Sequence, residues 1–326
     1  MTSTPSRRDI VRATLLVAAS ACCFGSISPL TLIALDHGVS LQGIQAWRYS
    51  TTAILLLAYG AWRARATSQR PTALAVGVTP SPWYTPRVLL IAGGGQASVA
   101  TLALLALRWI PAATEAFLFY TFPAWVAMLM AARGIERIDR SRGIALTLAL
   151  GGIAIMVGAP DAASLHPTGV AIALAASVVY ALYIPVLGAL QQGRPSLDVS
   201  RAIAVGGSLI FLTWSLATGT LFAHFDGVAI AASVLQGVLS SVAFLGVLAG
   251  LSTLGAVRTA ITSTSEPFWT ALLGFALLDQ RIGVSTIVGG VVIMAAVLLL
   301  QRPSVPSEPL HSSSSHTGDR PDHPIP

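Results

Sequence analysis

Residues 256–278 read AVRTAITSTSEPFWTALLGFALL, an apolar stretch that contains an arginine, a glutamate and a proline. The stretch exceeds the roughly 20 residues that a helix needs to cross a bilayer. Four polar side chains follow one another at intervals of four residues, which predicts one polar helix face: Arg258, Thr262, Glu266 and Thr270. A carboxylate at mid-membrane is costly unless it is paired, protonated or hydrated, so Glu266 is a candidate functional residue.

The composition of the whole chain is that of a polytopic membrane protein. Of its 326 residues, 54% are hydrophobic and only 10% are charged. All 19 basic residues are arginine, and against 13 acidic residues they give a net charge of +6. These arginines are spread over loop ends instead of forming a patch, which argues against a nucleic-acid partner. Cys22 and Cys23 are adjacent in an apolar run, so no disulfide framework is expected.

Apolar segments recur along the chain with mostly short connections. Ten can be marked, at about 13–35, 41–62, 88–107, 111–132, 143–159, 168–190, 202–222, 229–251, 256–278 and 282–300. We divide the chain into a cytoplasmic N-terminus at 1–12, a first repeat of five helices at 13–159, a second at 168–300, and a disordered cytoplasmic tail at 302–326.

The arginines also predict the orientation in the membrane. Nearly all loop arginines fall on the side that holds the N-terminus, and the other side has only Arg108 and Arg281. Because cytoplasmic loops carry an excess of Lys and Arg, both termini are expected in the cytoplasm and the protein in the inner, or plasma, membrane.

An internal repeat relates the two halves. A shift of 144 residues aligns several identical residues: Gly93 with Gly237, Pro123 with Pro267, and Trp125 with Trp269. Each half has an odd number of spans, so the two copies must lie in opposite orientations. The sequence therefore predicts an all-α membrane protein of ten transmembrane helices, arranged as two inverted five-helix repeats in the manner of many secondary transporters.

The two repeats resemble a known family. Residues 107–138, LRWIPAATEAFLFYTFPAWVAMLMAARGIERI, and residues 252–282, STLGAVRTAITSTSEPFWTALLGFALLDQRI, resemble the paired repeat of the EamA family in the drug/metabolite transporter superfamily. The family pattern places a Glu-Arg pair after the helix that contains the proline. The first copy keeps it as Glu136-Arg137, whereas the second has Gln280-Arg281. The resemblance implies a carrier of small organic metabolites such as amino acids, often an exporter.

Few ionisable side chains lie clearly within the apolar segments. Arg48 and Glu115 are predicted at similar depths in the second and fourth spans, about 10 Å and 6 Å from the outer end at 1.5 Å per residue. They could form a pair, with Arg48 in either a substrate or gating role or a purely structural one. Arg258 is interpreted as an anchor whose long side chain reaches the cytoplasmic interface.

Glu266 lies near the midplane and has two possible roles. It could exchange a proton against a substrate, or its Glu-Pro sequence could be a packing motif. Further candidates for substrate binding or coupling are polar and aromatic residues of the same spans: Ser263, Thr262, Tyr120, Trp269, Gln96 and Tyr180. Prolines at 29, 123, 185 and 267 form two symmetric pairs, so the four helices that contain them are expected to line a central cavity.

Other function classes fit the sequence less well. An intramembrane enzyme would need a nucleophile or metal ligands, but the six histidines fall in loops or the tail: His37, His166, His224, His311, His316 and His323. We therefore expect no catalytic residue, metal or cofactor. A channel or a non-transporting scaffold remains the alternative to a carrier. The expected partners are a small-molecule substrate, the lipid bilayer and a coupling proton, with the protein a monomer or a homodimer.

Overall fold

The computed structural model describes residues 6–67, 82–110, 112–136, 138–158, 166–222, 226–278 and 283–300. Within these ranges the chain is helical and contains no strand. Seven described helical segments are long and apolar enough to cross a membrane, and two shorter apolar helices close the second half. The protein is therefore an all-α membrane protein, as predicted. The expected tail at 302–326 and the residues Arg137, Gln280 and Arg281 lie outside the described ranges.

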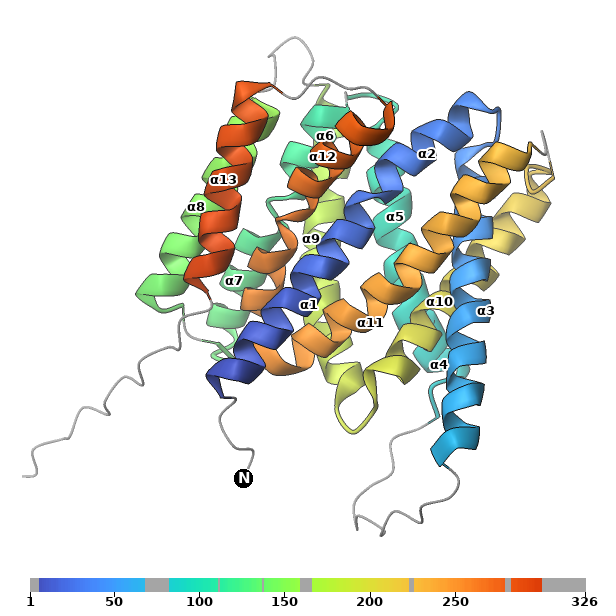
Figure 1. Ribbon diagram of the computed structural model, residues 1–326, viewed down its shortest axis with the longest axis horizontal. Coiled ribbons are helices and arrows are strands. Elements are labelled where there is room, and N and C mark those ends of the chain that lie inside the picture. The colour runs from blue at the N-terminus through green and yellow to red at the C-terminus, as the bar shows by residue number, and fades with distance from the viewer. Residues whose placement is uncertain are drawn as a thin grey trace, which may run out of the picture.

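Figure 1 shows the helices as one bundle. In chain order they are α1 (Arg7–Gly25), α2 (Ile27–Asp36), α3 (Leu41–Thr67), α4 (Pro86–Leu89), the π-helix η1 (Leu90–Gly94), α5 (Gly95–Ala106), α6 (Ala112–Phe119), α7 (Phe122–Ala132), α8 (Arg140–Val157), α9 (Pro167–Gln191), α10 (Ser196–Ala217), α11 (Gly227–Ser263), α12 (Glu266–Leu278) and α13 (Val284–Leu299). The start of α1 and the end of α13 lie at the same end of the bundle, at the bottom of the figure.

Three of the predicted spans are broken in the middle. The breaks separate α1 from α2, α6 from α7, and α11 from α12, and each comes two or three residues before a proline. At each break a hydroxyl group donates a hydrogen bond to the carbonyl three residues earlier: Ser26 to Cys23 at 2.6 Å, Thr121 to Leu118 at 2.6 Å, and Ser265 to Thr262 at 2.9 Å. Carbonyl groups at a helix break inside a membrane need hydrogen-bond donors, and these hydroxyls provide them.

A tight turn at Gly255 joins two of the predicted spans. Helix α11 contains the whole predicted span 229–251 and the first third of 256–278, and its backbone leaves helical geometry at Gly255, with φ 78° and ψ 175°. An L-residue with a side chain rarely adopts this conformation, which explains the glycine. Residues 256–263 then run back into the bundle toward α12 (Figure 1).

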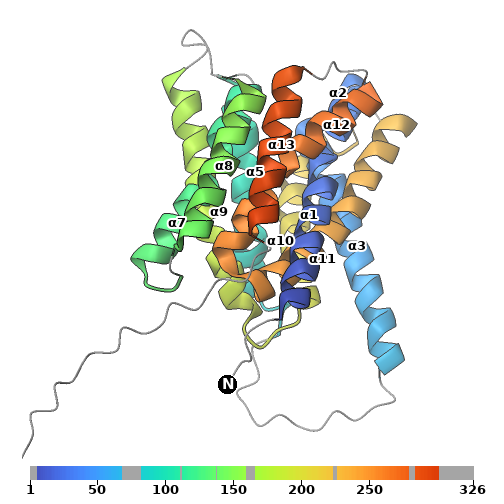
Figure 2. The same ribbon diagram turned by 60° about the vertical axis from the view of Figure 1, so that its left-hand side comes forward.

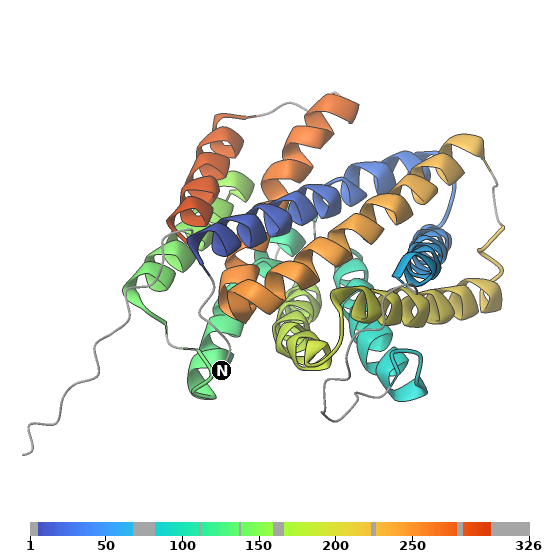
Figure 3. The same ribbon diagram turned by 60° about the horizontal axis from the view of Figure 1, so that its bottom comes forward.

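The packing of the helices pairs the first half with the second. Helix α1 packs along α11, and α5 packs along α9. Helix α3 packs on α10, and α8 packs on α13. Figure 2 shows α8 beside α13, and Figure 3 shows α1 lying alongside α11 over much of its length. Each half is thus interleaved with the other instead of forming a separate body.

Glycines permit the closest of these contacts. A Cβ added to Gly93 in η1 would overlap the backbone of Gly206 and Gly207 in α10. A Cβ added to Gly237 in α11 would lie 2.8 Å from the carbonyl oxygen of Arg48 in α3. Gly93 and Gly237 are equivalent positions of the sequence repeat, and each one brings its helix against the backbone of a helix from the other half.

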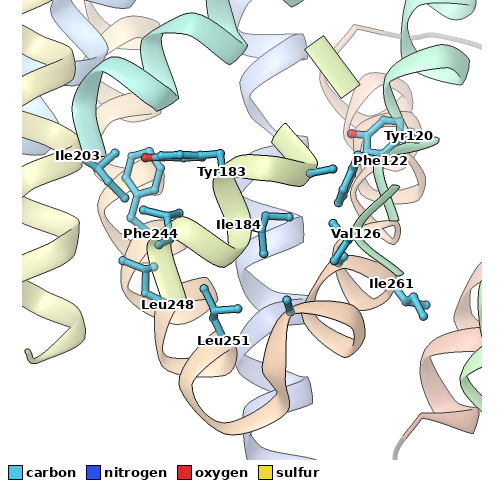
Figure 4. Close-up of a cluster of buried hydrophobic side chains, with 14 of the residues drawn as sticks. Tyr120, Phe122, Val126, Tyr183, Ile184, Ile203, Phe244, Leu248, Leu251 and Ile261 are labelled. Carbon is cyan, nitrogen blue, oxygen red and sulfur yellow. The ribbon is translucent and has the colours of Figure 1, made fainter. Parts of the chain in front are cut away.

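The largest cluster of buried side chains lies between the halves. Figure 4 shows Val126 and Ile184 facing Leu251 and Ile261, with Phe244 and Ile203 farther along the same interface. These side chains come from α7, α9, α10 and α11. The packed core thus surrounds the middle of the bundle, where the broken helices meet.

Candidate functional site

A cavity of about 170 Å³ lies in the middle of the bundle, among helices of both halves. Its wall contains four of the residues predicted from the sequence: Arg48, Gln96, Tyr180 and Glu266. Phe24, Ile27, Ser28, Val99, Phe119, Leu187, Ile203, Phe244 and Val247 complete it. Arg48 and Glu266 are the charged members of this set. The four proline-containing spans all contribute, through α1 and α2, α6, α9 and α12, as their symmetry predicted.

Glu266 reaches the cavity because the ninth span is broken. It is the first residue of α12, directly after the Thr264–Ser265 break. Gly25 of α1 faces it from the other side of the interface, where an added Cβ would lie 2.9 Å from the Glu266 carbonyl oxygen. The hydroxyl of Tyr120, at the break between α6 and α7, hydrogen-bonds with the Glu266 carboxylate. Arg48 is near enough to act on that carboxylate electrostatically.

Arg48 is held by side chains of α3 and α11. It is 6% exposed. Its Nε donates a hydrogen bond to the hydroxyl of Ser240 at 2.9 Å, and its Nη1 donates one to the Oε1 of Gln45 at 3.2 Å. Its guanidinium also lies 4.9 Å from the centroid of the Tyr49 ring. These contacts fix the cation on the cavity wall and leave it available to an anionic group.

The predicted pair of Arg48 with Glu115 does not form among the described residues. Arg48 bonds to Ser240 and Gln45 instead, and the ion pairs of these residues do not include Glu115. Glu115 lies in the first turn of α6, and its buried Oε1 has no hydrogen-bond partner in the described part of the chain. Its electrostatic neighbour is Glu266. Similar predicted depth in the membrane therefore did not suffice to predict a contact between the two side chains.

The polar face predicted for residues 256–278 is interrupted. Because the helix breaks at Thr264–Ser265, Arg258 and Thr262 belong to a different helical segment from Glu266. The hydroxyl of Thr262 donates to the carbonyl of Arg258 at 2.8 Å, and that of Ser263 donates to the carbonyl of Thr259 at 3.0 Å. Both hydroxyls are therefore used within their own helix, and neither residue belongs to the cavity wall.

Trp269 stands beside the site without lining the cavity. It lies on α12 next to Phe268, with ring centroids 5.3 Å apart. Its Nε1 is buried and has no partner among the described residues. An added Cβ on Gly25 would lie 2.9 Å from the Trp269 Cβ, so this tryptophan forms part of the tight contact between α1 and α12 that positions Glu266.

Arg258 is buried, whereas an anchor that reaches the interface would be exposed. It is 7% exposed, and the charges of Arg142, Asp139 and Glu136 surround it. Glu136 also bonds Arg142, at 3.2 Å between Oε2 and Nη1. The interpretation of Arg258 as a cytoplasmic anchor did not anticipate that the loop after α7 folds over the start of the ninth span, where Glu136 accepts from the backbone of Ala256.

Aromatic side chains form one wall of the cavity. The rings of Phe119 and Tyr180 are stacked with centroids 5.5 Å apart, and Phe122 meets Tyr180 edge-on at 4.7 Å. Phe244 of α11 closes another side. Sequence analysis named Tyr180 but missed Phe244, Ser28 and Ser240, since single apolar or hydroxyl residues in a membrane span carry no signal that separates them from ordinary packing.

Comparison with known proteins agrees with this architecture. The family profile described as the EamA-like transporter family matches residues 167–302. The second half of the chain is thus similar to the EamA-like transporter family. No curated protein matches the chain. One solved structure, described only as a crystal structure of a protein, has a TM-score of 0.70 at 18% sequence identity, over 88% of this chain and 95% of its own.

The EamA-like match confirms the family resemblance seen in the sequence. It covers α9 to α13, which include Tyr180 and Glu266 of the cavity. The similarity to the solved structure extends over nearly the whole chain and shows that the fold is shared. The apolar helices and these similarities together indicate a multi-pass membrane protein.

Proposed function

We propose that this protein is a secondary transporter that exports small organic metabolites, such as amino acids, by alternating access. The observation that carries the proposal is the central cavity, which is lined by Arg48 from the first half and by Glu266 from the second. Binding sites of secondary transporters typically lie near the bilayer midplane, at the interface of two repeats and next to interrupted helices. The volume of about 170 Å³ is small beside the ~300–1,000 Å³ of drug-sized sites, which favours a small substrate.

The packing supports ten transmembrane helices in two inverted repeats, at 13–159 and 168–300. In that arrangement α3 and α10 are equivalent, as are α8 and α13, and both equivalent pairs pack on each other. The contact of α1 with α11 has its counterpart in the contact of α5 with α9. Gly93 and Gly237 make equivalent backbone contacts. Two similar units that meet across such an interface can open alternately to either side.

The chemistry of the cavity suggests a role for each candidate. Arg48 would bind the carboxylate of the substrate, because a guanidinium presents donors in the geometry of a carboxylate. Glu266 would bind a proton or an ammonium group, with Tyr120 as its hydrogen-bond partner. Gln96 and Tyr180 would contact the substrate from the wall. Glu115 would respond to the charge of Glu266. Thr262, Ser263 and Trp269 would shape the helix break that presents Glu266.

Counterflow of labelled amino acids in proteoliposomes tests the proposal. A carrier should show saturable uptake that is accelerated when unlabelled substrate is enclosed, because the loaded carrier returns faster through exchange. A channel would give flux without this acceleration, and a scaffold would give none. An enzyme would convert the labelled compound, which chromatography of the vesicle contents would detect. Absence of counterflow across a broad metabolite panel would overturn the proposal.

The proposed orientation has its own test. Both termini are placed in the cytoplasm, which agrees with the described ends of α1 and α13 lying at one end of the bundle (Figure 1). A membrane-impermeant thiol reagent applied to intact cells should label a cysteine at His37, which lies at the opposite end after α2. Labelling of a cysteine at Ser6 instead would reverse the assignment.

A further inference from the structure

A second cavity lies next to the central one and has the chemistry of an anion site. It measures about 110 Å³ and lies between α3, α5 and α10. Its polar lining consists of Gln42, Gln45, Thr101 and Arg108, and no carboxylate lines it. Leucines with Phe211 and Trp214 form the rest. We call it the peripheral cavity.

One residue connects the two cavities. Gln45 lines the peripheral cavity and is only 5% exposed. Its Oε1 accepts a hydrogen bond at 3.2 Å from Arg48, which lines the central cavity. The amide of Gln45 is therefore oriented by the cation of one cavity while it forms the wall of the other. An anionic group that leaves Arg48 would meet Gln45 next.

Arg108 supplies the positive charge of the peripheral cavity. It follows α5 and is solvent-exposed, and within the described ranges the ion pairs do not include it. Leu41, the first residue of α3, lines the same cavity, so the site lies near the end of the bundle opposite the start of α1. The guanidinium donates hydrogen bonds to an anion, and the two amides and the hydroxyl can turn a donor toward it. The leucines and aromatic rings of the wall can contact a short apolar part of the same ligand.

We propose that the peripheral cavity is a second binding site for the carboxylate of the transported metabolite, which moves between Arg48 and Arg108 past Gln45. The proposal rests on the proposed transport function. It assigns the substrate an anionic group, and it places that group at a defined point between the central cavity and one side of the membrane. Arg108 and Gln45 bind the carboxylate there, and Thr101 lies within the same wall.

Thiol modification measures the anion preference of the peripheral cavity without requiring transport. The test uses Thr101→Cys in full-length protein with Cys22 and Cys23 changed to alanine, reconstituted in phosphatidylcholine. When each rate is divided by the rate of the same reagent with a free thiol in solution, a negatively charged methanethiosulfonate should react with this cysteine on the order of fivefold faster than a positively charged one of similar size, because Arg108 concentrates anions. Arg108→Gln should bring the ratio close to one. Arg87→Gln is the matched control, since Arg87 is an exposed arginine at the other end of the same span, and it should leave the ratio unchanged.

Protection experiments identify the ligand. Propionate should slow the modification of the cysteine at position 101, whereas propionamide, a neutral molecule of similar shape, should not. If protection requires phosphatidylglycerol in the vesicles and propionate has no effect, the site binds a lipid phosphate and the proposal is wrong. Equal reactivity of the two reagents, or a ratio that Arg108→Gln does not change, would also overturn it. Counterflow that persists in that case would leave the transport function standing, so the two failures can be told apart.

Discussion

The Oε1 atom of Glu136 accepts a hydrogen bond from the backbone N–H of Ala256 at 2.8 Å. Glu136 follows α7 in the first half, and Ala256 comes directly after the Gly255 turn in the second half. The bond therefore joins the halves at the end of the bundle where Ile10 and Ala13 of α1 pack against Leu254. Ala256 opens a helical segment, so the carboxylate acts as its N-terminal cap.

Glu136→Ala should lower the free energy of unfolding by about 1–2 kcal/mol, the usual loss when a helix cap is removed. It also removes the partner of Arg142. Glu136→Gln should retain most of the stability, because the amide oxygen can still accept from Ala256. Thermal unfolding of the purified proteins in detergent measures the stability of both variants. Asp139→Ala is the control, since Asp139 caps only its own helix, α8, by accepting from the N–H of Arg142 at 2.8 Å. If Asp139→Ala lowered the stability as much as Glu136→Ala, the link between the halves would have no special role.

Gly255→Ala should lower the stability of the protein more than an ordinary alanine substitution at a glycine with positive φ. Its backbone lies at φ 78°, and an added Cβ would be 2.8 Å from the Glu136 Oε1. Gly158 has nearly the same backbone conformation, φ 81° and ψ 168°, and nothing within 4 Å of such a Cβ, so Gly158→Ala measures the backbone cost alone. That cost is about 1–3 kcal/mol. We expect Gly255→Ala to lower the melting temperature clearly further than Gly158→Ala, and equal shifts would show that the carboxylate moves aside freely.

Local patterns in the sequence predicted the fold well, because a membrane span needs a long apolar run and its breaks need prolines. The proline pairs indicated four of the spans that line the cavity but not α3, α5, α10 and α11, which also contribute. Glu266, Arg48, Gln96 and Tyr180 lie in its wall, as predicted. The pairing of Arg48 with Ser240, and of Glu136 with Ala256, could not be predicted. Both contacts depend on which helix faces meet at the interface between the halves. A single sequence predicts how deep a residue lies in the membrane, but not how its helix is rotated about its axis. Thr262 and Ser263 were misassigned because their spacing assumes a helix that continues past residue 263.

Gly93→Ala should disrupt the contact between η1 and α10, whereas Gly94→Ala should be tolerated. A Cβ on Gly93 would overlap the backbone of Gly206, which cannot move aside as a side chain does. A Cβ on Gly94 would lie 3.5 Å from the Leu90 Cδ1, an ordinary contact. Overpacking of this kind costs typically ~1–3 kcal/mol. Melting temperatures of the two purified variants provide the comparison, and a stable Gly93→Ala protein would mean that these helices are less closely packed than described.

Ser240→Ala should weaken substrate binding through Arg48. The Ser240 hydroxyl accepts from Arg48 Nε at 2.9 Å, and its loss leaves a charged donor to reorient in the cavity. Hydrogen bonds to charged groups contribute roughly 1.5–3 kcal/mol, so KM in counterflow should rise by about tenfold or more. Ser241→Ala is the neighbouring control, because Ser241 donates to the Gly237 carbonyl of its own helix at 2.8 Å. A rise in KM for both variants, or for neither, would contradict the positioning role of Ser240.

Glu266→Gln should uncouple transport from the proton gradient while it preserves the fold. Glutamine has nearly the volume of glutamate and keeps an acceptor for Tyr120, but it cannot release a proton. If substrate and proton compete for this carboxylate, the wild-type protein should transport faster under an imposed pH gradient, and the variant should catalyse exchange at a rate that the gradient does not change. Glu115→Gln is the matched control, because Glu115 lies in the same region but outside the cavity wall. It should keep the gradient dependence, because the side chains that act on the Glu266 carboxylate are Tyr120 and Arg48. Vesicle uptake with and without a gradient, together with gel filtration of each variant, separates the outcomes. A folded Glu266→Gln protein with an unaltered response to the gradient would show that this glutamate is structural, and the coupling group would then have to be sought at Glu115.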